Sequence, residues 1–183
     1  MPQGTNPPSL SWLQPGRDAV VEQVVRGRDD LATATDEIRQ CFDYWAELAA
    51  ERRALPSHRQ IRPNRISRLL SRFVLVELRP GGEWMPTYRL AGTEFERIAG
   101  RSLTGRKVSE LFDPGGYARL TDLFTAIVAD RLPRLQQVRL WFPGRDFFVV
   151  QRLFLPWSAG GGEVDFIGGV VLEVGRPGTL PSP

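Results

Sequence analysis

The stretch that decides the fold runs from Phe73 to Leu111 and reads FVLVELRPGGEWMPTYRLAGTEFERIAGRSLTGRKVSEL. Its first part, residues 73–78, is an apolar and β-branched run, which predicts a strand. Turn residues follow at 79–82, where the sequence is RPGG. The pattern becomes extended again over 87–91. This stretch therefore predicts two strands joined by a tight connection.

Helical segments follow this pair of strands. Thr93 suits the N-cap of a short helix over 94–99, and Gly100 can end that helix in a left-handed conformation. A longer helix is expected over 117–130, because its apolar residues recur at helical spacing. Leu132-Pro133 ends that second helix, since proline cannot continue it.

Three further strands are expected after the long helix, over 135–142, 147–155 and 164–174. Gly168-Gly169 in the last of them predicts a bulge or a close backbone contact. With a further short helical segment around 108–112, the resulting order is β-β-α-α-α-β-β-β. It predicts an α+β fold in which a five-stranded antiparallel sheet carries its helices on one face.

Composition divides the chain into four parts. Residues 1–16 are rich in Pro, Gly, Ser and Asn and are typical of a flexible arm, whereas 17–72 form an N-terminal helical extension. Residues 73–174 form the main domain, and 175–183 are expected to be a disordered tail. A chain of 183 residues with 42 % hydrophobic and 25 % charged residues can bury one substantial core.

Three helices are expected in the N-terminal extension, over 18–26, 36–53 and 65–71. The second carries an apolar stripe at spacings of three and four, formed by Ile38, Cys41, Phe42, Trp45, Leu48 and Ala49. This stripe packs inside the molecule, or it forms a dimer or signal-transmitting interface on the outer face of the sheet. Internal packing and an interface are compatible if part of the stripe stays exposed. The candidate interface residues are Phe42, Trp45, Leu48, Arg65 and Arg68.

Arginines are frequent from the end of the helix expected over 36–53 to residue 72, and Glu51 is almost the only acidic residue near them. They are Arg52, Arg53, Arg59, Arg62, Arg65, Arg68 and Arg72. They form either a solvated face with salt bridges or a surface for an anion or an acidic partner. The net charge of +3 and pI near 9.6 also admit nucleic-acid binding. That excess is modest and almost all arginine, so nucleic acid is not our first expectation.

Two groups of residues resemble a known family. The segment AGTEFERIAG at 91–100, followed by LTGRKVSELF at 103–112, resembles a PAS domain. In PAS domains the second strand runs into a short helix that ends at Gly, and a Gly-Arg step leads to the next helix. Upstream, Tyr44-Trp45, LPSHRQIRP at 55–63 and YRLAGT at 88–93 resemble a narrower family. It consists of bacterial single-domain PAS proteins, alphaproteobacterial in type, whose function is unknown.

This resemblance covers about 36–174 and frames the cofactor options. PAS domains that bind haem usually ligate it through a histidine on the helical side of the pocket, whereas the sole histidine here, His58, precedes the first main strand. Flavin photosensors need a cysteine in an Asn-Cys-Arg-type helix, and the sole cysteine, Cys41, has no such context. No His/Cys/Asp cluster has metal-ligand spacing. We therefore expect neither haem, photoreactive flavin nor metal, and leave an unidentified small ligand open.

A ligand would lie between the helices and the sheet, in an apolar pocket with a few polar anchors. Tyr88 and Arg89 point to opposite faces of their strand, so only one of them can face this cavity. An inward arginine would need an acid or an anionic ligand as its partner. The candidate pocket residues are Tyr88, Arg89, Phe95, Val108, Leu111, Phe112, Phe124, Arg139, Trp141 and Gln151. The alternative is that they fill the core.

The resemblance implies a sensory or protein-interaction role, and the sequence lacks nucleophile-elbow, phosphate-loop and dinucleotide motifs. We therefore expect a non-enzymatic signalling adaptor that forms a homodimer and binds a further signalling protein. The alternatives are a sensor proper for a metabolite or fatty acid, and a nucleic-acid-associated regulator that uses residues 52–72. The absence of a signal-peptide pattern or a long apolar run predicts a cytoplasmic protein that does not enter membranes.

Overall fold

The computed structural model describes residues 21–52, 54–140 and 148–175. Six strands form one antiparallel sheet in the order β1-β4-β5-β6-β2-β3. The strands are β1 (Val21–Val24), β2 (Phe73–Glu77), β3 (Thr87–Ala91), β4 (Arg134–Leu140), β5 (Phe148–Trp157) and β6 (Phe166–Gly175). The α-helices are α1 (Asp36–Arg52), α2 (Thr93–Ala99) and α3 (Pro114–Asp130).

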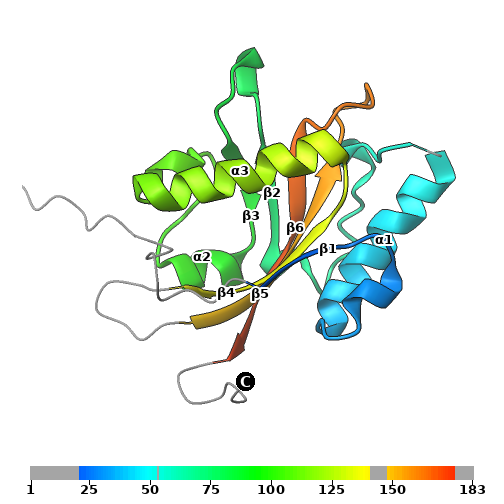
Figure 1. Ribbon diagram of the computed structural model, residues 1–183, viewed down its shortest axis with the longest axis horizontal. Helices are drawn as coiled ribbons and strands as arrows, with labels where there is room; N and C mark the ends of the chain where they lie inside the picture. Colours follow the sequence, from blue (N-terminus) through cyan, green and yellow to red (C-terminus); the bar gives the residue numbers. More distant parts are fainter. Residues whose placement is uncertain (1–20, 53, 141–147, 176–183) are drawn as a thin grey trace, which may run out of the picture.

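Helices cover both faces of this sheet. Figure 1 shows α2 and α3 on one side, and α1 on the other. Side chains of β5 alternate between the two sides, as the pleat of a strand requires. Val150 and Phe154 pack with α2 and α3 in one hydrophobic cluster, here called the α3 core. Leu153 and Trp157 pack with α1 in a second cluster, here called the α1 core.

The α+β antiparallel architecture is confirmed, with one strand more than the five predicted. The expected helix over 18–26 is wrong within its described part, because Val21–Val24 is a strand. This strand pairs with β4, from Val21 opposite Gln137 to Val24 opposite Arg134. Pairing gives hydrogen-bond partners to an edge of β4 that would otherwise be bare. Valines on either side of Glu22-Gln23 suit such an edge strand.

The expected helix over 65–71 is also wrong. This segment consists of successive tight turns, in which Arg65, Leu69 and Arg72 each donate a backbone N–H to the carbonyl three residues earlier. A short 3-10 helix over Leu70–Arg72 then leads into β2. The predicted inward residues Ile66 and Leu69 are nevertheless buried. Burial of these side chains requires only that the chain turns, and not that it forms an α-helix.

The other predicted elements are present with shifted ends. α3 begins three residues earlier than predicted, because the Asp113 carboxylate caps it by accepting a hydrogen bond from the Gly116 N–H at 2.6 Å. Gly100 ends α2 with a φ of 69°, as predicted. The close contact predicted at the glycine pair is confirmed, since a Cβ at Gly169 would lie 1.9 Å from the Leu153 carbonyl oxygen. The predicted N-terminal arm, residues 1–16, lies outside the described residues.

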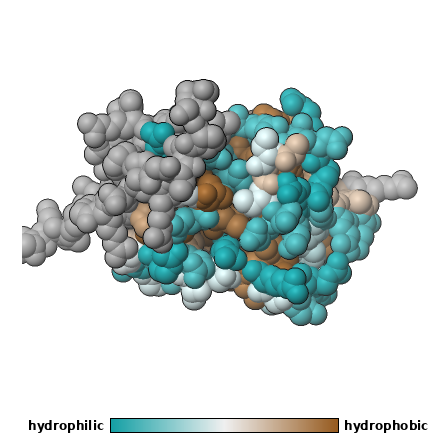
Figure 2. Space-filling model, turned by 90° about the horizontal axis from the view of Figure 1, so that it is seen from below, coloured by the Kyte–Doolittle hydropathy of each residue, from teal (hydrophilic) through white to brown (hydrophobic). Residues whose placement is uncertain are grey.

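The described part of the chain leaves few large apolar side chains on its surface. Leu90 and Val174, at 37 % and 38 % exposure, are the most exposed of them among the described residues. In the view from below, Figure 2 shows hydrophilic side chains over much of the described surface, with hydrophobic atoms in the gaps between them. Two cores built on one sheet therefore account for most of the apolar residues. A few polar side chains are also buried in these cores, and the candidate sites are built around them.

Candidate functional site

Six of the predicted pocket residues come together in the α3 core. Tyr88 and Phe95 contact one another with ring centroids 6.1 Å apart. Phe124 meets Phe154 of β5 edge to face, with centroids 5.7 Å apart. Val108 and Leu111 are buried beside them, and Phe112 packs against the cluster while partly exposed. These contacts are those of a packed core, which was the alternative stated for this set.

The other four predicted pocket residues lie elsewhere. Arg89 is exposed and forms an ion pair with Glu77 at 3.0 Å, so Tyr88 is the inward residue of the two. Gln151 is buried on the opposite face, where it contacts the segment before α1. Arg139 is half-buried, and the alternation of β4 places it opposite Val138 and therefore away from the α3 core. Trp141 lies outside the described residues.

Arg152 is the inward arginine that the sequence reasoning missed. It is 7 % exposed and alternates with Val150 and Phe154, which both belong to the α3 core. A signal for it existed in the sequence, because an arginine in the middle of FFVVQRLFL must point into one of the two faces of a buried strand. A register shift of one residue exchanges Gln151 for Arg152 on a given face.

A row of polar side chains crosses three neighbouring strands at Arg152. Glu22 of β1 lies opposite Gln136 of β4, which in turn lies opposite Arg152 of β5. The Nε of Arg152 donates to the Gln136 amide oxygen at 2.8 Å, and the Gln136 amide nitrogen donates to the Glu22 carboxylate at 2.8 Å. The Arg152 guanidinium also lies over the Phe154 ring, 5.1 Å from its centroid.

The electrostatics of this row follow from burial. Desolvation lowers the pKa of Arg152 to about 10, although the nearby Tyr88 and Glu22 favour its charged form. Arg152 therefore remains a cation at neutral pH. Burial also raises the pKa of Tyr88 well above its ordinary value, and the Arg152 charge opposes this rise only in part. The site thus contains a buried cation and a neutral phenol.

A hollow of about 370 Å³ opens beside this row, between α3 and the sheet. Leu120, Leu123 and Ala126 of α3 form one wall. Gln136 and Arg152 form the opposite wall. The exposed residues Glu22, Arg119 and Asp122 complete its rim. An apolar wall that faces a buried cation can take a ligand with one apolar end and one anionic end.

The candidate interface residues on α1 are largely used within the protomer. Phe42 and Leu48 are buried in the α1 core. Trp45 is half-buried, and its indole N–H donates to the Pro156 carbonyl at 2.8 Å. Packing inside the molecule therefore accounts for most of the stripe, and the dimer interface stays a prediction. Arg65 and Arg68 are exposed and border a second hollow of about 370 Å³, which lies between α1 and the segment 65–69.

The residues weighed for cofactors have structural roles. The His58 ring stacks on Phe166 with centroids 4.0 Å apart, and its Nδ1 lies 3.1 Å from the Ser158 carbonyl oxygen. Cys41 is buried in the α1 core, and burial raises the pKa of its thiol to about 12. Within the described ranges, no group of three His, Cys, Asp or Glu side chains is placed to hold a metal ion. No described helix is long and apolar enough to span a bilayer.

An antiparallel sheet with α2 and α3 on one face and α1 on the other defines a small α+β domain. More particularly, the chain belongs to the PAS domain family, whose model matches residues 34–172. Its general role is therefore that of a sensory or signalling domain.

The chain also resembles a solved structure described as "Structure of an RNA-binding Light-Oxygen-Voltage Receptor". The two are 19 % identical with a TM-score of 0.45, over 65 % of this chain and 35 % of that chain. This chain therefore spans about a third of that receptor. No curated protein matches the sequence.

Proposed function

We propose that this chain is a cytoplasmic, non-enzymatic signalling adaptor, and that it binds an acidic segment of a partner protein. The surface concerned consists of α1 and the segment 59–72, here called the arginine loop. One observation carries the proposal: Arg59, Arg62 and Arg68 are exposed and form no ion pair with any described residue. Family membership supports the signalling role, and the charge of the loop supports the choice of partner.

The arginine loop is fixed to α1 by Tyr44. The Tyr44 hydroxyl donates to the Gln60 carbonyl at 3.1 Å and accepts the Arg62 N–H at 2.9 Å. The Arg65 guanidinium lies over the Tyr44 ring, 5.6 Å from its centroid, and reaches Glu47 through two hydrogen bonds of 3.0 and 2.9 Å. These contacts hold the loop backbone in place, so the remaining arginines are presented from an ordered support.

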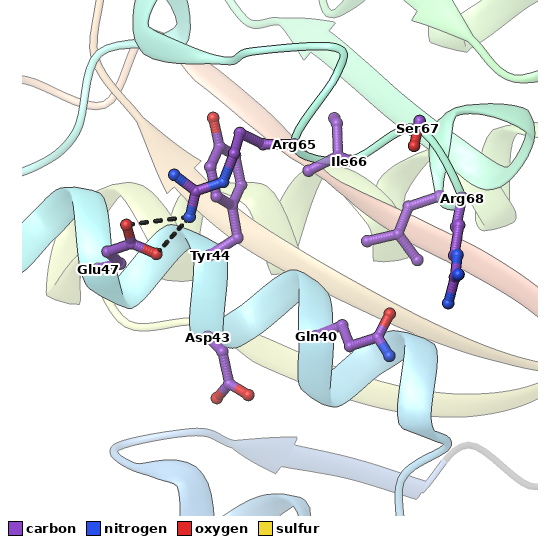
Figure 3. Close-up of a pocket in the computed structure, with 9 residues that line it drawn as sticks. Gln40, Asp43, Tyr44, Glu47, Arg65, Ile66, Ser67 and Arg68 are labelled. Atoms are coloured by element: carbon purple, nitrogen blue, oxygen red, sulfur yellow. Dashed lines mark hydrogen bonds and ion pairs between the residues drawn. The ribbon is translucent and has the colours of Figure 1, made fainter.

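The charges in the adjoining hollow leave a positive excess. Figure 3 shows Arg65 reaching across Tyr44 to Glu47, Asp43 pointing away from the loop, and Arg68 lying apart from this pair. Asp43 is already paired with Arg28 at 3.0 Å, and Glu47 with Arg65. Both acids on the α1 wall are thus neutralised. An acidic segment that lies along the hollow and continues over the arginine loop can pair with Arg68 and Arg62 without displacing an existing ion pair.

Fluorescence anisotropy with a labelled oligoglutamate peptide tests this proposal on the full chain. The double variant Arg62→Gln/Arg68→Gln should bind the peptide about fivefold or more weakly. Arg131→Gln is the matched control, because Arg131 is exposed, has no ion pair with a described residue and lies at the end of α3. Equal binding by the double variant and the wild type would refute the surface. Tighter, steeply salt-dependent binding of duplex DNA through the same arginines would favour a nucleic-acid-associated regulator instead.

The homodimer is part of the same proposal. The half-buried edge of Trp45 and the exposed, charged side of α1 are the surface left for it, because Phe42 and Leu48 are buried. Size-exclusion chromatography with light scattering on the full chain should give twice the mass of 20.6 kDa. A single-chain mass over the whole concentration range of the peptide assay would contradict the dimer and leave the acidic-partner surface to be judged by anisotropy.

A second candidate function is a sensor proper, which binds a small molecule. The hollow between α3 and the sheet favours it, because this hollow combines an apolar wall with the buried Arg152. The adaptor and the sensor use different faces of the sheet. They can therefore be tested separately.

A further inference from the structure

Two arginines are buried on the same face of the sheet, and they differ in their partners. Arg134, 4 % exposed, is paired with the Asp130 carboxylate, donates to the Leu132 carbonyl at 2.9 Å and lies 3.8 Å from Glu22. Arg152, 7 % exposed, has no carboxylate within ion-pair distance among the described residues. One buried charge is therefore neutralised and the other is not.

The fold gives Arg152 a fixed direction rather than a counter-ion. Its one hydrogen bond to a described residue runs from Nε to the neutral amide of Gln136. The Nη N–H groups are thus left for other partners. Taking a cation out of water without a counter-charge is costly, and a neutral amide repays only part of that cost. A bound anion would supply the missing charge.

The hollow beside Arg152 has the shape and polarity for such an anion with an apolar body. Its volume of about 370 Å³ lies at the small end of the range for ligand pockets. Leu120, Leu123 and Ala126 offer an apolar wall about two helical turns long. The rim carries two acidic side chains, Glu22 and Asp122, and one basic side chain, Arg119, so its net charge does not favour an anion near the mouth. A carboxylate is therefore favoured at the inner end of the hollow, beside Arg152.

We propose that this hollow binds a small amphipathic monocarboxylate, whose carboxylate pairs with the Nη groups of Arg152 and whose apolar body lies against α3. Two parallel N–H···O bonds to a carboxylate are the strongest arrangement a guanidinium offers. Gln136 holds the Nε side, so the two Nη groups are oriented before the ligand arrives. This inference rests on the second candidate function and gives it a ligand class.

Isothermal titration calorimetry of the full chain with sodium octanoate tests the proposal. Octanoate should bind at one site per chain, and octan-1-ol and octylamine should bind at least about tenfold more weakly, because they lack the anion. Arg152→Gln should weaken octanoate binding by about tenfold or more while leaving octanol binding unchanged. Arg89→Gln is the control, since Arg89 is an exposed arginine that is already paired with Glu77.

Ala126→Phe provides a second variant that keeps Arg152 and fills the hollow. It should abolish octanoate binding while the melting curve shows a folded protein. Equal affinity for octanoate and octanol, blocked by Ala126→Phe, would overturn the carboxylate and keep the sensor. Octanoate binding that neither variant changes would overturn the site itself, as would no binding at all. The oligoglutamate assay reads the other face, so the adaptor proposal stands or falls independently.

Discussion

The two faces of the sheet treat their buried polar groups in opposite ways. Gln151 and Arg152 are neighbours in β5 and are both 7 % exposed, yet they point to different faces. Toward α1, Gln151 accepts the Thr35 N–H at 3.1 Å and donates to the Thr33 carbonyl and to the Gln137 side chain. Toward α3, Arg152 keeps a charge without a carboxylate. The hydrogen-bonding groups of Gln151 are thus satisfied within the α1 core, whereas Arg152 in the α3 core has room for a further partner.

This difference distinguishes the α1 core from the proposed ligand site in the α3 core more clearly than the hydrophobic patterns do. Both cores bury large aromatic side chains, such as Trp157 of β5 in the α1 core and Phe124 of α3 in the α3 core. Apolar packing alone would therefore give the two faces the same meaning. The unneutralised cation and the adjoining hollow distinguish them. The predictions below test this contrast, beginning with the largest expected effect.

Trp157→Ala tests how far the α1 face depends on apolar packing. Trp157 is 1 % exposed, and its loss should lower the free energy of unfolding by about 3–5 kcal/mol, because the cavity cannot close fully. Urea unfolding followed by circular dichroism measures this. Octanoate binding by the protein that remains folded should not change, since the site lies across the sheet. A loss of stability under about 1 kcal/mol would mean that α1 is only loosely attached.

Substitutions at two neighbouring positions should change stability by different amounts. Gln151→Leu leaves the Thr35 N–H, the Thr33 carbonyl and the Gln137 side chain without this hydrogen-bond partner. It should therefore lower the free energy of unfolding by about 1–3 kcal/mol. Arg152→Met removes a buried charge but also removes the donor to the Gln136 amide oxygen, so the two effects offset and stability should stay within about 1 kcal/mol of the wild type. Urea midpoints of both variants decide the matter. Similar losses for both would show that Arg152 is as fully satisfied as Gln151, which would erase the contrast between the faces.

The sequence predicts most of the regular elements because their signals are local. Periodicity gives α1 and α3, and alternation with turn residues gives β2 to β6 apart from their ends. β1 was not predicted, because a four-residue edge strand is defined by the strand it pairs with. Read alone, VVEQVV at 20–25 also fits a helix. The turns over 62–72 were predicted as a helix for a similar reason, since burial of Ile66 and Leu69 fits both a helix and a series of turns.

The candidate site is harder to predict than the fold. Tyr88, Phe95 and Phe124 lie in one cluster because their elements pack on one face, and a ligand-binding role for them stays a prediction. Arg152 depends on the register of β5, where an error of one residue replaces it by Gln151. The hollow combines residues of β1, β4, β5 and α3, and no single segment carries its pattern. Its rim includes Glu22, which belongs to the strand that was missed.

Tyr44→Phe tests whether the arginine loop needs its attachment to α1. The change removes the acceptor of the Arg62 N–H and the donor to the Gln60 carbonyl, and should cost about 0.5–1.5 kcal/mol. Affinity for oligoglutamate should fall by about twofold to threefold, because the arginines lose their ordered support. Anisotropy measures the affinity and urea unfolding the stability. Phe42→Leu, a change in the α1 core, is the control that should leave peptide binding unaltered.

The smallest effect concerns the neutralised arginine on the α3 face. Partial burial works to raise the pKa of Asp130, but hydrogen bonds from Arg134 and the Leu132 N–H outweigh it, so the pKa is lowered from its ordinary value of 3.8. A carboxyl whose pKa is lower in the folded state stabilises the fold above its unfolded-state pKa. That stability is lost as the pH falls below 3.8 and through the folded-state pKa.

Asp130→Asn should therefore flatten the fall in stability with decreasing pH below this value, measured as urea midpoints across acid pH. The flattening should be slight, because the Asp130 side chain is 39 % exposed and solvent screens the pair. Arg152→Met has no paired carboxylate to release and should leave the acid slope as it is in the wild type. If both variants flatten the fall of the urea midpoint with pH equally, then Arg152 has an acidic partner, and both buried arginines are neutralised.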